Sequence, residues 1–453
     1  MGSLSIALLN TAQAQQVYTR ALNVLQTNIA NVNTPGYASQ TPGFINLPFN
    51  PDAGLPGGLT FGPLQNTRSI YSEQAVQDQQ GNLNQNQQLT SDLQRLNATF
   101  DLNSTSGIPS TLSKLFNSFS TLSVSPNDPL ARQQVISSAT TAAQAINTTA
   151  QNIGRATSET DNQTVDTVNA INTDVSQLQA LNEQRRTSPL SAHDAGIDAQ
   201  VYAKLEDLSQ YVNVSSIAQP DGTVNVYLAG QTPLLVGTHS YSIQASPTQN
   251  STAILNADNQ DITSQITTGK LSALIQQRNT LLPGYQNDIN SLAKTLADTV
   301  NGQLASGVDT TGAAPTVDLF TYDPVAGAAT TLSVTNIKPE QIAAAQSASP
   351  GGNGNSLVLA QLATAKTVSG LNFSQFYGNI AARFGNDLST AKQNTTSAQA
   401  LLAQAQSYRS QQQGVSLDQQ AVQVQQFQQS YQATGEMFRV LNGLMQTTID
   451  MIR

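Results

Sequence analysis

The sequence predicts a mainly α-helical protein with a small β insert, in which a long helical bundle domain is carried on a coiled coil of paired N- and C-terminal helices. Two observations lead to this prediction. Apolar residues recur with heptad spacing at both ends of the chain, and long stretches between the ends repeat apolar residues at helical intervals. In the middle of the chain the spacing changes to alternation, which is typical of strands.

The N-terminal segment places apolar residues in alternating steps of four and three, which gathers them on one face of a helix. We expect this helix to end at Val32, because residues 33–36 contain a proline that cannot continue it and a glycine that permits a turn. The predicted stripe consists of Leu4, Leu8, Thr11, Gln15, Tyr18, Leu22, Leu25, Ile29 and Val32.

The C-terminal segment carries the same periodicity, in the stripe Val424, Phe427, Tyr431, Thr434, Phe438, Leu441, Met445, Thr448 and Ile452. Matched stripes at opposite ends of a chain predict that the two helices pair with each other. The alternative is that each helix packs separately on a globular body. A coiled coil of this length with polar interruptions is marginal when isolated, so we expect the pair to need further partners to become rigid.

The first half of the chain between these ends alternates between extended and helical segments. Residues 37–71 are rich in Pro and Gly and predict an extended segment with short strands. Residues 128–186 lack an internal break apart from Pro129 at the start and one Gly, which predicts a long helix with room for one interruption. Residues 199–211 predict a further helix.

The second half begins with the β insert. Val224, Val226 and Leu228 alternate with outward residues, and Asp221-Gly222 is a tight-turn signal. Residues 271–304 predict a helix with a kink or break at Pro283-Gly284. Short strands within 320–334 and helices near 356–367, at 384–412 and at the C-terminus complete the series.

These segments predict three domains. An N-terminal axial part pairs with the C-terminal helix, two separate stretches form the helical bundle, and the β insert stands between them. The predicted bounds are 1–80 with 400–453, 81–211 with 267–399, and 212–266, with short strands near 318–336.

Composition and charge exclude several classes of function. The net charge of −9 and the lack of Lys/Arg clusters argue against nucleic acid and anionic membranes as partners. Because the chain has no Cys, disulfides and thiolate chemistry are excluded. Its two histidines, His193 and His239, have no partners at metal-ligand spacing and no triad order. The sequence therefore predicts no enzyme, no cofactor and no metal.

Residues 28–37 read Asn-Ile-Ala-Asn-Val-Asn-Thr-Pro-Gly-Tyr and resemble the N-terminal motif of flagellar axial proteins, which include rod proteins, the hook protein and hook-associated protein 1. The motif identifies the superfamily but not the member. The resemblance implies that it acts in assembly. The residues carried over as the assembly motif are Asn31, Asn33, Thr34, Pro35, Gly36 and Tyr37.

Interior segments resemble the hook-associated protein 1 family, in the same order along the chain. These segments are 115–119 with 126–135, 221–228 with 233–237, 269–298, and 414–433. Rod and hook proteins are not expected to carry them. Larger relatives insert an outer β domain after a Phe-Phe-like pair, whereas here Leu319-Phe320 leads almost directly into residues 331–335. The resemblance therefore implies a short member without that domain.

The resemblance implies a structural subunit at the junction between flagellar hook and filament. Its expected partners are the hook protein, a second hook-associated junction protein, further copies of itself in a ring, and an export chaperone at the C-terminal helix. It implies an extracellular location, reached through the flagellar export apparatus, and the sequence shows no cleaved signal peptide. The alternatives are a hook or distal rod protein, or a secreted coiled-coil adhesin or hydrolase.

The residues expected at the interface of the terminal helices come from the two stripes. They are Leu22, Leu25, Ile29, Val32, Val424, Phe427, Tyr431, Phe438, Leu441 and Met445.

Overall fold

The structure is a computed structural model that describes residues 2–50, 55–102, 104–187 and 194–452. Helices hold 65% of the residues and strands 12%, which confirms the mainly α-helical class with long helices at both ends. The chain folds into two compact units, which are described separately below.

The first unit combines both ends of the chain with a middle segment, and comprises residues 1–82, 171–242 and 398–453. The second comprises residues 83–170 and 243–397. Three helices contribute residues to both units: α2 (Ile70–Leu96), α4 (Pro129–Thr187) and α10 (Phe373–Gln413). This division differs from the predicted bounds in two respects. Residues 171–211, predicted in the bundle, belong with the termini, and the predicted β insert at 212–266 is divided between the two units after residue 242.

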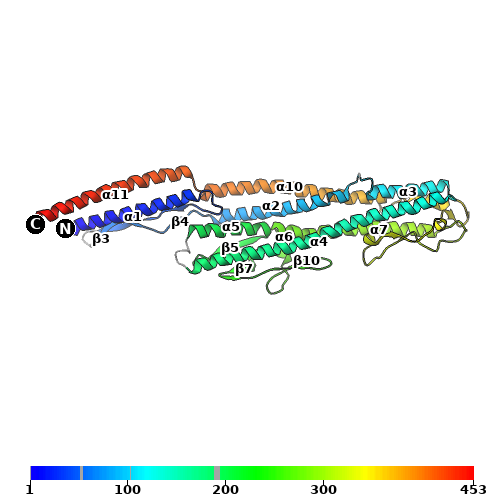
Figure 1. Ribbon diagram of the computed structural model, residues 1–453, viewed down its shortest axis with the longest axis horizontal. Helices are drawn as coiled ribbons and strands as arrows, with labels where there is room; N and C mark the ends of the chain where they lie inside the picture. The colour runs from blue at the N-terminus through cyan, green and yellow to red at the C-terminus, as the bar shows by residue number, and fades with distance from the viewer. Residues whose placement is uncertain (1, 51–54, 103, 188–193, 453) are drawn as a thin grey trace. The chain divides into compact units, whose positions relative to one another are not determined.

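Two antiparallel helices at the ends of the chain form the most extended part of the first unit (Figure 1). These are α1 (Gly2–Ala30) and α11 (Leu417–Ile452), which lie side by side. A hairpin of β2 (Phe44–Asn50) and β3 (Leu55–Phe61) packs along α1, and a short ladder joins β1 (Gln40–Thr41) to β4 (Gln65–Asn66). Residues 37–71 thus form short strands around an extended chain, as the Pro and Gly content predicts.

A four-stranded antiparallel sheet and α5 (Ala195–Tyr211) form the middle of the first unit. The strands follow chain order: β5 (Val214–Ala218), β6 (Val224–Leu228), β7 (Thr232–Val236) and β8 (His239–Ser240). In β6, Val224, Val226 and Leu228 are buried and the residues between them are half-buried, which matches the predicted alternation.

The end of α4 is fastened to this sheet by polar side chains. Asn182 donates to the carbonyls of Val224 and Gly237 at 2.8 and 2.6 Å and accepts from the Val224 amide at 3.0 Å. Arg185 donates to the Gly222 carbonyl and pairs with Asp198 at 2.9 Å. These bonds place the end of α4 with the sheet and α5, rather than with the bundle.

The second unit is a helical bundle with one continuous apolar core. Its core side chains come from α2, α4, α10, α3 (Ile108–Val124), α7 (Leu282–Ala305) and α9 (Gly354–Gln361). Phe100 stacks on Phe384 with ring centroids 4.6 Å apart, and both rings contact Tyr285. α4 is continuous over 59 residues, so the one break that the sequence allowed within residues 128–186 is absent from this helix.

An irregular turn interrupts the helical stretch after α6 (Gly269–Gln276). The predicted kink at Pro283-Gly284 is displaced, because Pro283 lies in the first turn of α7 and the irregularity is the π-helix Gln277–Leu281. The turn directs Arg278 and Asn279 toward the hairpin of β9 (Gln244–Pro247) and β10 (Thr252–Leu255). Arg278 pairs with Asp161 at 2.8 Å, and Asn279 bonds both the amide and the carbonyl of Thr252.

The remaining described strands of the second unit are two residues long each, and they form two antiparallel pairs. β11 (Gly307–Val308) pairs with β14 (Ala345–Gln346), and β12 (Phe320–Thr321) pairs with β13 (Ser333–Val334). Only the short helix α8 (Ala328–Thr331) stands between β12 and β13. This arrangement leaves no separate domain at the place where the sequence suggested a missing one.

Candidate assembly surface

The α1 face turned into the first unit differs slightly from the predicted stripe. Its buried residues are Thr11, Val17, Ala21, Leu25 and Asn28. Of the predicted interface residues, Leu25 is fully buried, Leu22 and Val32 are half-buried, and Ile29 is 37% exposed. The offset arises because α1 packs against the β2–β3 hairpin as well as α11, so its buried face is centred between two neighbours.

The α11 face turned toward α1 follows the predicted stripe closely. We call this the inner stripe: Val424, Phe427, Thr434, Phe438, Leu441, Met445 and Thr448, all half-buried. Tyr431 lies on the same face and is 38% exposed, while the side chain of Ile452 lies outside the described residues. Phe427 packs against Tyr18 of α1 and Phe44 of β2, with ring centroids 6.3 and 5.5 Å apart.

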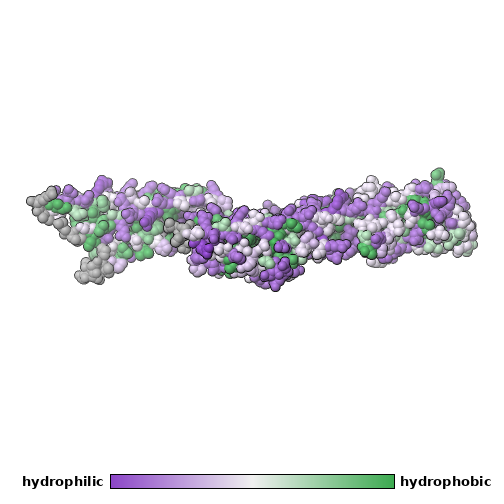
Figure 2. Space-filling view, turned by 60° about the horizontal axis from the view of Figure 1, so that its bottom comes forward, coloured by the Kyte–Doolittle hydropathy of each residue, from purple (hydrophilic) through white to green (hydrophobic). Residues whose placement is uncertain are grey.

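A second row of apolar residues lies beside the first on α11 and is uncovered. We call this row the outer stripe: Val422, Met437, Val440, Leu444 and Met451, which are 51–75% exposed. It is closely spaced at residues 437–444, while Gln426, Gln429 and Ala433 occupy the same face between that part and Val422. Figure 2 shows apolar side chains among polar ones on the surface of this part of the molecule. The neighbouring exposed side chains Met437, Val440 and Leu444 favour a surface that another molecule covers.

A buried hub of three polar side chains and the backbone of Gln40 closes the inner end of the α1–α11 pair. Asn28, fully buried, donates from its amide to the Gln40 carbonyl at 2.8 Å and to Gln420 Oε1 at 3.1 Å. Its oxygen accepts from the Tyr37 hydroxyl at 2.8 Å and from the Gln40 amide at 3.0 Å. The Asn28 hub, as we name these four residues, therefore joins α1, the extended segment and α11.

The motif between α1 and the extended segment divides into an exposed turn and a buried end. Asn33, Thr34 and Pro35 are exposed, and Asn31 accepts at 3.0 Å from the Thr34 hydroxyl. Gly36 has φ of +72°, and a Cβ there would stand 2.3 Å from the Ala199 carbonyl of α5. Glycine is needed at this position for both its conformation and its space.

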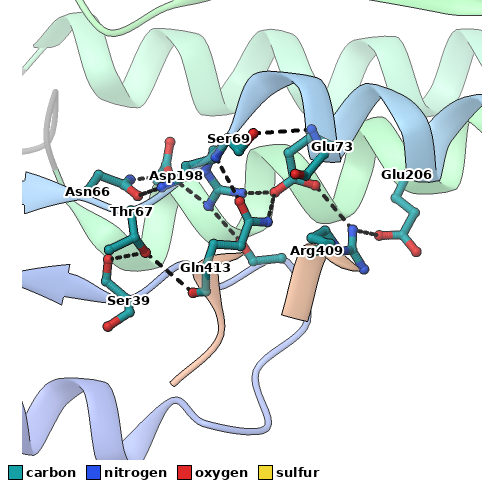
Figure 3. A network of polar contacts seen from close by, with 12 residues as sticks. Ser39, Asn66, Thr67, Ser69, Glu73, Asp198, Glu206, Arg409 and Gln413 are labelled. Atoms are coloured by element: carbon teal, nitrogen blue, oxygen red, sulfur yellow. Dashed lines mark hydrogen bonds and ion pairs between the residues drawn. The ribbon is translucent and has the colours of Figure 1, made fainter. Parts of the chain in front are cut away.

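A cluster of ion pairs lies next to the motif turn (Figure 3). This charge network consists of Arg68, Arg185, Arg409, Glu73, Asp198 and Glu206. Figure 3 labels Glu73, Asp198, Glu206 and Arg409 among them. It therefore contains three arginines and three carboxylates, so its formal charges cancel.

Glu73, which is only 2% exposed, lies at the centre of the charge network. Its carboxylate pairs with Arg68 and with Arg409, the latter at 3.1 Å, and accepts from the Gln413 side chain at 2.6 Å. Arg409 also pairs with Glu206 of α5 at 2.6 Å. A single carboxylate at the start of α2 thus holds the end of α10.

Arg68 connects the same network to the motif. Its guanidinium stacks on the Tyr202 ring, 3.8 Å from the ring centroid, and donates to Asp198 at 2.9 Å. It also donates to the carbonyl of Gly36 at 2.7 Å. Backbone bonds continue the connection, because the Ser39 amide donates to the Gln413 carbonyl at 2.9 Å.

The environment shifts the pKa of several of these groups. Burial raises the pKa of the Tyr37 hydroxyl to about 12, so it stays protonated and donates to Asn28. Burial also raises the pKa of Tyr202, against the opposing effect of the Arg68 charge. For Arg409, burial lowers the pKa, but the bond to Glu206 and the charges of Glu206 and Glu73 outweigh it, so the net direction is upward.

Within the described ranges, no group of three or more His, Cys, Asp or Glu side chains is placed to hold a metal ion. His239 packs edge-on against Tyr241 in the first unit, and His193 lies outside the described residues. No described helix is both long enough and apolar enough to cross a membrane. The arrangement of this surface is suited to holding helices together.

The helical bundle and adjoining segments match a known family. The family model of the flagellar hook-associated protein FlgK helical domain matches residues 74–320, more than half of the chain. This chain belongs to the FlgK family of flagellar hook-associated proteins. The resemblance seen in the interior segments is thereby confirmed.

Named relatives agree with the family. Flagellar hook-associated protein 1 of Salmonella typhimurium is 28% identical over 318 residues, which cover 67% of this chain and 56% of that protein. The match thus spans little more than half of the Salmonella relative's length. Flagellar hook-associated protein 1 of Bacillus subtilis is 23% identical over 501 residues and covers 99% of both chains.

A solved structure shows the same fold as this FlgK-family chain. The flagellar hook junction protein FlgK from Burkholderia pseudomallei superposes with a TM-score of 0.68 at 18% identity. The alignment covers 76% of this chain and all of that one.

Sequence patterns did not single out the residues that close this surface. Asn28 lies inside the quoted motif but not among the residues selected from it, and Gln420 lies in a glutamine-rich stretch. The partners in the charge network are far apart in sequence, with Glu73 and Arg409 separated by 336 residues. The sequence offered one signal for Asn28: it is a polar residue near the end of an otherwise apolar stripe, between Leu25 and Ile29.

We expect Glu73→Ala to destabilise the first unit by about 3–5 kcal/mol, because it leaves Arg68 and Arg409 without their shared buried carboxylate. Chemical unfolding, with hydrogen exchange at the Ser39 amide as a local probe, measures the effect. Glu436→Ala is the control, since Glu436 pairs with Arg439 on an exposed face of α11 and should change stability by about 0–1 kcal/mol. Equal small effects from both changes would show that the network is not a stabilising centre.

Stability should also depend on alkaline pH through Tyr37. Its folded-state pKa of about 12 lies above the ordinary value of 10.0, so its contribution is complete below pH 10 and is lost as pH rises from 10 to 12. Comparing the unfolding free energy of the parent with that of Tyr37→Phe cancels the effect of the other tyrosines. The stability advantage of the parent should shrink across this pH range. A constant difference between the two proteins would contradict the assignment.

Proposed function

We propose that this chain is a structural subunit of the bacterial flagellum that joins hook to filament. Membership of the FlgK family and the names of the relatives support this proposal. The observation that carries it in this chain is the outer stripe of α11, an apolar surface left uncovered beside one already used within the chain.

The terminal helices are suited to close contact with neighbouring molecules. Arg20 is the single charged residue of α1, and along α11 the charged residues are Asp418, Glu436, Arg439 and Asp450. Little charge has to lose its hydration when such helices pack together, while each buried apolar side chain contributes about 1.5–3 kcal/mol. In the proposed role these helices bury their outer faces against other subunits, and the protein acts mechanically rather than as a catalyst.

The proposed partners follow from the junction role. Further copies of this chain form a ring, with the hook protein on one side and a second hook-associated junction protein on the other. Before export, a chaperone covers α11, since its outer stripe would otherwise expose apolar side chains to other proteins. After passage through the flagellar export apparatus the subunit is extracellular.

A strain lacking this gene tests the proposal directly. We expect electron microscopy to show hooks without filaments, and flagellin to accumulate in the medium as monomer. Loss of the hooks would instead place the protein in the rod or hook. Normal flagella would overturn the proposed function altogether.

Complementation of that strain tests the role of the helix pair. Leu25→Asp should fail to restore filaments, because it places an unpaired carboxylate at a fully buried position between α1 and its neighbours. Gln26→Asp introduces the same charge at the next position, which is exposed in the isolated chain, and should leave the helix pair of the purified protein closed. Circular dichroism of the purified proteins checks that the second unit remains folded in both. Normal filaments with Leu25→Asp would contradict the requirement for a closed pair.

A further inference from the structure

The two apolar stripes of α11 are adjacent over residues 437–445, where both consist of apolar side chains. The outer residues Met437, Val440 and Leu444 each precede an inner residue, Phe438, Leu441 and Met445. Over residues 437–445, a rotation of α11 by about 100°, one residue of an α-helix, would therefore exchange one stripe for the other. Because apolar attraction is not directional, it discriminates poorly between these two orientations over residues 437–445, and Phe427, packed on Tyr18 and Phe44, is the inner residue that favours the observed one.

The Asn28 hub does discriminate between them. Both amide hydrogens of Asn28 and both acceptor positions of its oxygen are in use, and one of the four bonds comes from α11, through Gln420. Asn28 is 0% exposed and Gln420 6%, so both side chains are shielded from water in the observed arrangement. Turning or sliding α11 carries Gln420 away and leaves a buried N–H unpaired. Such a loss is enough to shift an equilibrium by about tenfold.

We propose that Asn28 and Gln420 set the rotation and register of α11 on α1, and thereby determine which apolar stripe the subunit presents to its neighbours. Asn28 is thus a specificity-determining residue for assembly. A buried asparagine in an otherwise apolar helix seam is known to fix register at a cost in stability. The claim about rotation concerns the isolated chain, and only its consequence for neighbouring subunits rests on the proposed function.

Single-cysteine labelling measures the rotation. The chain has no Cys, so a thiol introduced at one position reports on that position alone. Val422 is 66% exposed on the outer stripe, and Val424, on the inner stripe, is half-buried. In the full-length parent, a small maleimide should modify Val422→Cys faster than Val424→Cys. Adding Asn28→Leu should make the two rates equal or reverse their order, with helical content retained.

Two further variants keep the test decisive. Gln420→Leu removes the same bond from the other helix and should change the ratio in the same direction. Asn23→Leu makes the same substitution as Asn28→Leu at an exposed position of α1 and should leave the parent ratio intact.

An unchanged ratio with both hub variants would overturn the proposal. It would also be overturned if both thiols reacted at the rate of an unfolded peptide, since the hub would then hold the helix in place rather than select its face. Because labelling uses the purified chain, its outcome is separate from the phenotype of the strain without the gene.

Discussion

The carboxylate of Glu73 is the point on which the organisation of the first unit depends. It is buried between Arg68, which binds the motif turn and α5, and Arg409, which lies near the end of the long helix α10. Burying ionised groups is costly unless each is paired and hydrogen-bonded, so this carboxylate has few acceptable arrangements. Segments separated by hundreds of residues are thereby brought to one place in one geometry. The short strands and the start of α11 follow from that placement.

Charge and apolar surface have different tasks in this chain. Charged residues make up only 10% of the sequence, yet six of them gather in a single network within the first unit. The terminal helices adjoining this network are almost uncharged and carry apolar stripes instead. Ion pairs and hydrogen bonds, which are directional, thus fix where the terminal helices begin and how they are rotated. Burial of apolar side chains, which is not directional, holds the helices together along their length. A subunit that must fit one position in an ordered assembly needs both.

The sequence predicted those features that depend on local periodicity. The helix pattern, the alternating strand β6 and the inner stripe of α11 are visible in the spacing of Val, Leu and Phe. The buried face of α1 was misplaced by about one residue because the β2–β3 hairpin, a neighbour that periodicity does not reveal, competes with α11 for it. The π-helix before Pro283 was missed for a similar reason: Arg278 and Asn279 are drawn to a hairpin that begins far upstream. Long-range polar contacts such as Glu73 with Arg409 leave no periodic trace at all.

The low charge of the terminal helices creates a difficulty that the Asn28 hub resolves. A helix rich in Gln, Ser and Thr with two apolar stripes can bind in more than one orientation, and charge pairs that usually set helix register are scarce between α1 and α11. Adding such pairs would restore specificity, but it would also place charges on surfaces proposed to be buried between subunits. A fully satisfied amide at the inner end avoids this conflict, because it is neutral, already buried, and adjacent to the charge network that holds the neighbouring backbone. Specificity is thereby confined to one end of the pair, and the remaining length of both helices carries few charges where it contacts other subunits.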